Sequence, residues 1–555
     1  MVIMTLPQSP RVVPGKYLIP FIMLVSCFAL WGLLNNMTDN LVPAFQKIFT
    51  MDQSKAGLVQ VAFYGAYAVL AIFASILIEE FSYRVGVLIG LGIYIGGALL
   101  YIPACVEQSF NIYFIAIFVV ASGCSLLETT CNPYILSLGP KETAVRRLNF
   151  AQMFNPVGSM LGIVLAQQLI LANLNPMTAE ERDVLKKTNP DQLANIIHHE
   201  LFWVCAPYVG LCAVAFLIWV FFLKSKSSRD AEKLALDDAE KMVADADLGK
   251  DVPATEDRVP ASESVPACES VPAKKSGGLR VLIAAAFSLV PLTVLYFAFP
   301  QMDKVNWILL GMLGPIAYLV VMPAYREMLV ILLKKPRYWM GVIAQFFYVG
   351  VQIAAWTWLN VYCQKEMGVS PADAATYYTI SIVLFIVCRW VATFLMKYFN
   401  PAKMMACFAV AAIATCAGVM YLPSTVLFSI GGVDFAANVL CLIAMSGCMS
   451  LMFPTIYGIA LGGLDKKEVK LGASGLIIAI LGGAIITPWM SSCIDSGSLN
   501  ALVPGFDALV DENLKTSSAA VRSSFLVPAI CFAVVLIYAL IFRNPEKKND
   551  VPMAE

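Results

Sequence analysis

Residues 17–41 carry the stretch that decides the fold, YLIPFIMLVSCFALWGLLNNMTDNL. A helix needs about 20 predominantly apolar residues to cross roughly 30 Å of hydrocarbon, and this stretch is long enough. It is too long for the apolar region of a signal peptide, and no small-residue cleavage site follows it. We therefore predict an uncleaved first transmembrane helix.

Comparable stretches recur along the chain and form two groups of six. The first stretch is followed by residues 56–78, 85–104, 110–136, 148–173 and 201–223, and the second group comprises residues 339–362, 374–397, 403–422, 434–461, 471–494 and 524–542. The composition agrees, because 59% of the residues are hydrophobic and only 14% are charged, whereas soluble proteins have about 25% charged residues. These values exclude an ordinary soluble enzyme and a disordered protein. They predict an all-α polytopic membrane protein.

The centre of the chain differs from both groups. Residues 224–278 are rich in charge and contain the near-repeat Val-Pro-Ala, so they predict a linker that forms no core. Two further apolar stretches follow, at residues 279–299 and 304–324. We predict that they cross as an additional hairpin, which gives about 14 spans; the alternative is a pair of interfacial helices. The predicted domains are residues 1–223, a six-helix bundle; 224–278, the linker; 279–337, the hairpin; and 338–555, a second six-helix bundle with a tail.

Positive charge gives the orientation. Lys and Arg concentrate in the loops on the same side as the N-terminus, among them residues 141–147, 224–229, 334–337 and 466–470. Positively charged loops resist translocation, so both termini and the linker are predicted to be cytoplasmic. The count of crossings cannot tell whether the hairpin spans, because two crossings or none leave the same orientation.

Several function classes lack their sequence signatures. The chain has two His, adjacent in sequence, and 15 Cys without a CxxC pair, so neither a metal site nor a cofactor is expected. There is no GxxxxGK[ST] loop for ATP. A formal net charge of +0 gives no field that favours nucleic acid. The partners expected are the lipid bilayer and a small solute, with the chain acting as a monomer.

Two six-helix halves joined by a long linker are typical of a two-repeat transporter. Substrate then binds near the bilayer midplane between the halves, and rocking of the halves alternates its access.

Acidic residues within apolar stretches indicate function, because such residues usually face a cavity. Trp31, Asn36 and Asp39 can share one face of the first helix, and Glu128 lies in the fourth stretch with Asn132 one turn later. Burial disfavours a charged carboxylate and so favours its loading with a proton. We predict that Asp39 and Glu128 carry protons; the alternative is that either acid lies at a hydrated helix end or in a structural hydrogen bond. Four of these residues are also predicted to bind the substrate: Trp31, Asn36, Asp39 and Asn132.

Amide side chains follow in the fifth stretch, where Asn149, Gln152 and Asn155 precede Pro156. Amides bind sugar hydroxyls without adding charge, and the proline weakens the helix there. The alternative role for these amides is hydrogen bonding between helices.

The second half has a corresponding face. Gln352, Trp356 and Asn360 lie on one side of the seventh helix, and an aromatic ring beside amides suits a sugar, which has both C–H faces and hydroxyls. Arg389 lies inside the next stretch and is predicted to form a structural or coupling ion pair.

These residues also carry a family resemblance. The motifs are WGLLNNMTD (31–39), QVAFYGAY (60–67), LETTCNP (127–133), LGP (138–140), RLNFAQMFN (147–155), FYVGVQ (347–352), FPTI (453–456) and GGAIITP (482–488). The set resembles the L-fucose–proton symporter group of the major facilitator superfamily, over about residues 19–223 and 338–543.

The resemblance implies proton-coupled uptake of a monosaccharide across a bacterial inner membrane. Asp39 matches the family's first-span acid and Glu128 its proton-carrying acid, while five residues match cavity positions: Asn36, Gln152, Asn155, Gln352 and Trp356. The family plan has 12 spans, so residues 224–337 depart from it. The group also contains carriers of glucose, galactose or N-acetylglucosamine, so another sugar is one alternative to L-fucose. A sugar sensor that signals through residues 224–278 without transport is another.

Overall fold

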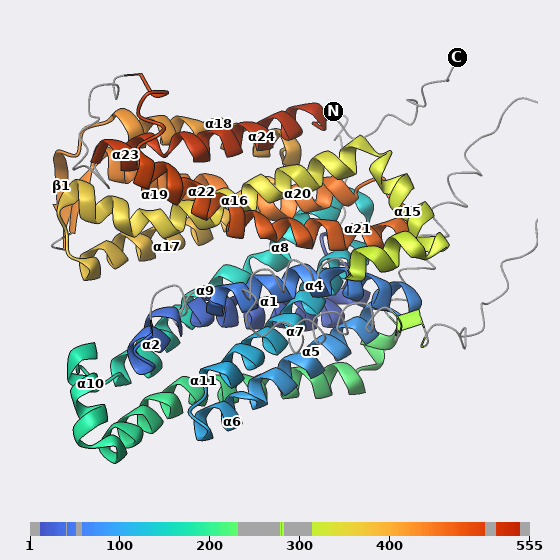
Figure 1. Ribbon diagram of the computed structural model, residues 1–555. Helices are drawn as coiled ribbons and strands as arrows, with labels where there is room; N and C mark the ends of the chain where they lie inside the picture. Colours follow the sequence, from blue (N-terminus) through green and yellow to red (C-terminus); the bar gives the residue numbers. More distant parts are fainter. Residues whose placement is uncertain are drawn as a thin grey trace, which may run out of the picture.

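The computed structural model describes residues 11–39, 41–51, 58–230, 278, 280–281, 283, 314–431, 433–504 and 518–543. Among these, 12 helices are long and apolar enough to cross a membrane. They form two groups, drawn in Figure 1 as blue-to-green helices below and yellow-to-red helices above.

The first half comprises the following elements: α1 (Leu18–Asp39), α2 (Leu41–Ile48), α4 (Leu58–Glu80), α5 (Tyr83–Leu99), α6 (Tyr101–Val106), α7 (Phe110–Ser137), α8 (Ala144–Gln152), α9 (Phe154–Leu165), α10 (Ala179–Thr188) and α11 (Pro190–Lys224). Short 3-10 or π turns stand at Gly15–Tyr17, Lys141–Thr143, Ala166–Ile170 and Leu171–Asn173. The fifth span is one helix in sequence but is divided into α8 and α9, because Pro156 cannot supply a backbone N–H.

The second half comprises α15 (Pro323–Leu333), α16 (Pro336–Met367), α17 (Pro371–Leu395), α18 (Pro401–Tyr421), α19 (Ala437–Met449), α20 (Met452–Leu461), α21 (Lys466–Ile478), α22 (Gly482–Ser496), α23 (Ser518–Ser523) and α24 (Leu526–Ile541). A 3-10 turn at Ala479–Leu481 separates α21 from α22. A two-stranded antiparallel hairpin, β1 (Val426–Ile430) and β2 (Val433–Ala436), connects α18 to α19.

The predicted additional hairpin is not confirmed. Most of residues 279–313 lie outside the described residues, and Gly314–Val321 meets α15 at a bend of 97°. Pro323 begins α15 at that bend. This bent pair adds at most a thirteenth span to the 12, so the prediction of 14 spans is also not confirmed. Among the described residues, α15 packs against α16 and α21.

In each half, glycines allow the first and fifth spans to cross closely. A Cβ at Gly158 or Gly162 on α9 would overlap the backbone oxygen of Ala29 or Leu33 on α1. In the second half, a Cβ at Gly482 on α22 would overlap the backbone oxygen of Phe346 on α16. The first and fifth spans of each half therefore touch backbone to backbone, as small residues allow in membranes.

The two halves meet mainly at one end of the bundle, which we call the linker end because α11 ends there at Lys224. The contacts between halves join α21 to α4 and α7, α20 to α8, and α17 to α8 and α9. Lys470 Nζ lies 3.8 Å from Glu79 Oε2, and Arg146 Nε donates to the Thr393 carbonyl at 3.3 Å. At the opposite, far end the halves diverge, with β1 and α17 above and α2 and α10 below (Figure 1).

The α15 region contributes to the linker end as well. Glu80, the last residue of α4, accepts hydrogen bonds from Arg280 Nη1 at 3.1 Å and from the Tyr325 hydroxyl at 3.0 Å. Two residues that follow the linker, Arg280 and Tyr325, are therefore attached to the first half.

The glycine crossing gives a stability prediction. We expect Gly158→Val to lower the yield of monodisperse protein in detergent and its melting temperature, because overpacking costs about 1–3 kcal/mol even where side chains can shift, and here the obstacle is backbone. Gly92→Val is the matched control, since nothing lies within 4 Å of a Cβ at that exposed glycine. Equal melting temperatures for the two variants would contradict this interpretation.

Candidate functional site

The amides of the fifth span form a bonded set with the fourth span. Gln152 Nε2 donates to Asn132 Oδ1 at 2.9 Å, and Asn132 Nδ2 donates to the Glu128 carbonyl at 3.0 Å. Both amide side chains are buried. Gln152 is the last residue of α8, so the break before Pro156 places it beside α7. The structure thus brings together three of the predicted site residues.

Glu128 is the acid at the centre of this set. Its side chain is 7% exposed, and among the described residues no Lys, Arg or His forms an ion pair with it. The Tyr67 hydroxyl from α4 lies beside Glu128 and Asn35. That hydroxyl and the Asn35 side-chain oxygen are buried without a hydrogen bond of good geometry. Among the described residues, Glu128 therefore has no positively charged partner that would stabilise its charged form. Two polar groups near it, the Tyr67 hydroxyl and the Asn35 side-chain oxygen, can still form hydrogen bonds.

The first span contributes residues with different surroundings. Asp39 closes α1, and its side chain lies outside the described part of the structure. Asn36 is half-buried. Asn155 Nδ2 donates to the Phe28 carbonyl at 3.5 Å, which joins α9 to α1.

Trp31, on the same helix α1, is buried. Its side chain is 1% exposed, and its ring centroid lies 4.2 Å from that of Phe28. In this conformation the ring packs in the hydrophobic core.

The second half supplies an aromatic wall. Trp356 on α16 is half-buried; its Nε1 donates to Ser446 Oγ at 3.1 Å, and its ring meets those of Phe385 (5.2 Å) and Tyr378 (6.4 Å) edge-on. Gln352 lies one turn before Trp356 and is half-buried. Asn360 lies one turn after it, and its side-chain oxygen is buried without a partner. An indole edged by amides is the surface expected for a sugar.

Arg389 does not form the predicted ion pair with any described residue. Its guanidinium donates instead to two backbone carbonyls, that of Gln152 at 3.0 Å and that of Ser450. It also lies 4.5 Å from the centre of the Phe385 ring. Backbone oxygens replace a carboxylate here, because helix breaks in both halves expose them to Arg389.

Sequence reasoning missed four residues of this region: Tyr67, Tyr378, Phe385 and Ser446. Each occupies an ordinary apolar or small-residue stretch, so the sequence gives little signal. Of the four, only Tyr67 had a sequence signal, because it is the last residue of the QVAFYGAY motif (60–67).

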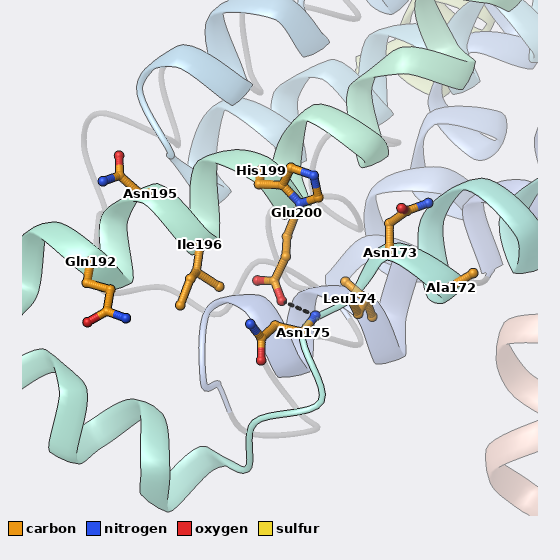
Figure 2. A pocket seen from close by; sticks show the side chains of 9 residues that line it. All are labelled: Ala172, Asn173, Leu174, Asn175, Gln192, Asn195, Ile196, His199 and Glu200. Carbon is orange, nitrogen blue, oxygen red and sulfur yellow. Dashed lines mark hydrogen bonds between the residues drawn. The ribbon is translucent and has the colours of Figure 1, made fainter.

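A separate hollow of about 500 Å³ lies between the end of the fifth span and the start of α11, away from these residues (Figure 2). It is lined by Ala172, Asn173, Leu174, Asn175, Gln192, Asn195, Ile196, His199 and Glu200. Glu200 is fully engaged, because it pairs with Arg182 at 2.5 Å and accepts from the Asn175 backbone N–H at 2.8 Å. This buried ion pair ties α10 to α11, and none of the predicted site residues lines the hollow.

Comparison with known proteins gives the class. A model of the Major Facilitator Superfamily matches residues 21–488. The chain therefore belongs to this superfamily, as the sequence motifs predicted.

The relatives are more specific. The chain is 33% identical over 531 residues to the L-fucose-proton symporter of Haemophilus influenzae, with 96% of this chain and 98% of that protein covered. It is 30% identical to the L-fucose-proton symporter of Escherichia coli, with 96% and 95% covered. A glucose/galactose transporter of Brucella abortus is 25% identical, with 93% and 92% covered.

Solved structures agree. The fold is similar to that of the Escherichia coli fucose:proton symporter FucP (TM-score 0.65, 26% identity, 95% of this chain and 100% of that chain covered). It is also similar to FucP in the outward conformation (TM-score 0.64, 27% identity, with the same coverage).

The Gln152–Asn132 hydrogen bond allows a test of the site's geometry. We expect Gln152→Ala and Asn132→Ala each to weaken sugar binding, and the double variant to lose less than the sum of the two. Contacting residues show interaction energies of about 0.5–3 kcal/mol. Binding would be followed by titration calorimetry. Strictly additive losses would show that the two amides act independently.

Proposed function

We propose that the chain is a secondary active transporter, not an enzyme, that imports L-fucose together with protons. Identity of 33% and 30% over nearly full length to L-fucose-proton symporters supports the cargo. The observation that carries the coupling is Glu128, a buried carboxyl group with no positive partner among the described residues, beside bonded amides. The free-energy cost of burying such a group in the bilayer interior is low only when the group is protonated.

We further propose a location in a bacterial inner membrane, with both termini and residues 224–278 in the cytoplasm. The distribution of Lys and Arg supports this orientation. The linker end is then the cytoplasmic end. Since the halves meet at that end, the conformation described here faces outward.

Contacts among the described helices support a division of the chain. Residues 1–223 and 338–555 are proposed as the two moving bodies, residues 224–278 as a linker, and residues 279–337 as an addition outside the transport core. Both walls of the proposed site come from one chain, so a monomer suffices.

The proposed cycle begins with the outward-facing state. Protons load onto Glu128 and Asp39, and the sugar binds between the halves. Six polar side chains are proposed to bind the hydroxyls: Asn36, Asn132, Gln152, Asn155, Gln352 and Asn360. Trp356 is proposed to cover an apolar face of the ring, and Trp31 and Asp39 are proposed to complete the substrate site from the first span.

Neutralisation then permits closure. A charged carboxylate in a closed, dry cavity costs several kcal/mol, so the halves close readily only over a protonated acid. Opening at the linker end lets water in, and the sugar and protons leave. The proton gradient drives the cycle and no cofactor is required.

Glu128→Gln is expected to abolish accumulation driven by a proton gradient and to retain exchange of labelled for unlabelled sugar. Glutamine keeps the neutral shape but cannot release a proton, and exchange does not require the empty carrier to return. Both activities would be measured in proteoliposomes, with Glu142→Gln, an exposed loop acid, as the control. Equal loss of accumulation and exchange in a correctly inserted variant would contradict a role in coupling.

Asp39→Asn is expected to reduce sugar uptake, because the first-span acid links sugar binding to protonation in this proposal. Initial rates and steady-state levels in proteoliposomes would be compared with those of the unsubstituted chain. Full accumulation by the variant would remove Asp39 from the mechanism.

The cargo is tested by competition. Uptake of labelled L-fucose under an inward proton gradient is expected to fall with unlabelled L-fucose and to persist with glucose, galactose or N-acetylglucosamine. If one of those sugars accumulates in place of L-fucose, the cargo is wrong and the mechanism stands. If sugars bind but none accumulates, the chain is a sensor.

A further inference from the structure

We propose that Arg389 is a positioning residue that latches the two halves together at the floor of the sugar site. Arg389 donates hydrogen bonds to two backbone carbonyls, one in each half, that lack their usual helical donor because the residue four positions later is a proline. This inference rests on the proposed alternation of the two halves but not on the identity of the sugar.

The first carbonyl belongs to Gln152 in the first half. In an α-helix the carbonyl of residue i accepts from the N–H of residue i+4, and for Gln152 that residue is Pro156, which has no N–H. Arg389 Nη1 donates to this oxygen at 3.0 Å. A side chain from the second half thus satisfies a backbone group of the first.

The second carbonyl belongs to Ser450, between α19 and α20. Residue i+4 is again a proline, Pro454, so this carbonyl also lacks its helical donor. Arg389 Nε donates to it. The same guanidinium therefore completes two proline-broken spans, the fifth of the first half and the fourth of the second.

The surroundings leave Arg389 few other partners. Its side chain is 3% exposed, and none of the described carboxylates pairs with it. The Phe385 ring lies 4.5 Å from the guanidinium and supplies a cation–π contact. A buried charge is costly unless it is hydrogen-bonded, so both halves must be in place to hold this one.

The latch is joined to the proposed binding site on both sides. Gln152, whose backbone accepts from Arg389, is the residue whose side chain bonds Asn132 next to Glu128. Phe385, whose ring lies against the guanidinium, is one of the two rings that meet Trp356. Separation of the halves at the linker end must break the bond from Arg389 to Gln152. Arg389 therefore stabilises the state that is closed at the linker end and releases the Gln152 backbone when that end opens.

The test measures conformation rather than transport. Spin labels would be placed at positions 142 and 397, exposed residues of opposite halves at the linker end, and their separation measured by pulsed dipolar spectroscopy. The labels would be carried on a genetically encoded keto amino acid, because the chain has 15 Cys. Without sugar, the unsubstituted chain is expected to show mainly the short distance. In Arg389→Gln the ratio of long to short distance is expected to rise about tenfold, since a buried carbonyl loses its donor when the linker end is closed.

Proline replacement supplies a more specific test. Pro156→Ala restores the backbone N–H that bonds the Gln152 carbonyl within the helix. In that background Arg389→Gln is expected to shift the distance ratio less than in the unsubstituted chain. Arg146→Gln is the matched control, because Arg146 also bonds a carbonyl across the halves, that of Thr393, which no proline has orphaned. Its effect is expected to be the same with Pro156 or Ala at position 156.

Two outcomes overturn the proposal. One is an unchanged distance distribution in Arg389→Gln, and the other is full additivity of Arg389→Gln with Pro156→Ala. If Arg389→Gln does not fold, Arg389→Lys decides the matter. The lysine ammonium keeps the charge but lacks the planar fork that reaches two carbonyls, so a smaller shift in the same direction is expected, and no shift contradicts the latch.

Discussion

The dry interior of the bilayer is the constraint on which the rest of this structure depends. Backbone groups in hydrocarbon must be bonded within the protein, which is why the chain spans as helices. Where prolines break those helices, the orphaned carbonyls must find partners elsewhere. Pro156 and Pro454 break one span in each half, and Arg389 donates to the carbonyl four residues before each. The breaks thus create both the irregular backbone of the site and the contact that closes it.

The same constraint explains why the acid and the amides occur together. Gln152 donates to Asn132 and Asn132 donates to the backbone carbonyl of Glu128, so these two amides have partners within the protein. The Tyr67 hydroxyl and the side-chain oxygens of Asn35 and Asn360 are buried without such partners. Unpaired polar atoms in a dry interior are costly, so hydroxyls or water brought in with a ligand would be bound there favourably.

The spans could be predicted from sequence because hydrocarbon thickness fixes their length. Residues 403–422, for example, were predicted and α18 covers Pro401–Tyr421. The β-hairpin could not, because Val426–Ile430 is as apolar as a helix of this protein, and the predicted span at 434–461 began inside β2. The stretch predicted at 304–324 runs across the bend of 97° that precedes α15, because its composition stays apolar through Pro323.

For the site, residue types were predictable and partners were not. Glu128, Gln152 and Asn132 were predicted from polarity within apolar stretches, and they lie together. Arg389 was expected to form an ion pair, because charged residues can be identified in the sequence. The sequence does not reveal which backbone carbonyls without a donor will lie near Arg389 in the fold. The spacing of residues around Arg389 gives no information about prolines on other spans, which leave the carbonyls near Arg389 without a helical donor. Tyr67 was missed since a tyrosine in a membrane helix is usually a packing or interface residue.

The central claim is that protonation of a buried acid permits closure around the sugar. The most direct measurement follows sugar and proton entry together in proteoliposomes, without an imposed gradient. Labelled L-fucose is added outside and the label that enters is counted, while a pH dye trapped in the lumen reports proton entry. The account predicts that added L-fucose acidifies the lumen, in a fixed ratio of protons to sugar as the sugar concentration is varied. Sugar entry with no change in luminal pH would contradict it.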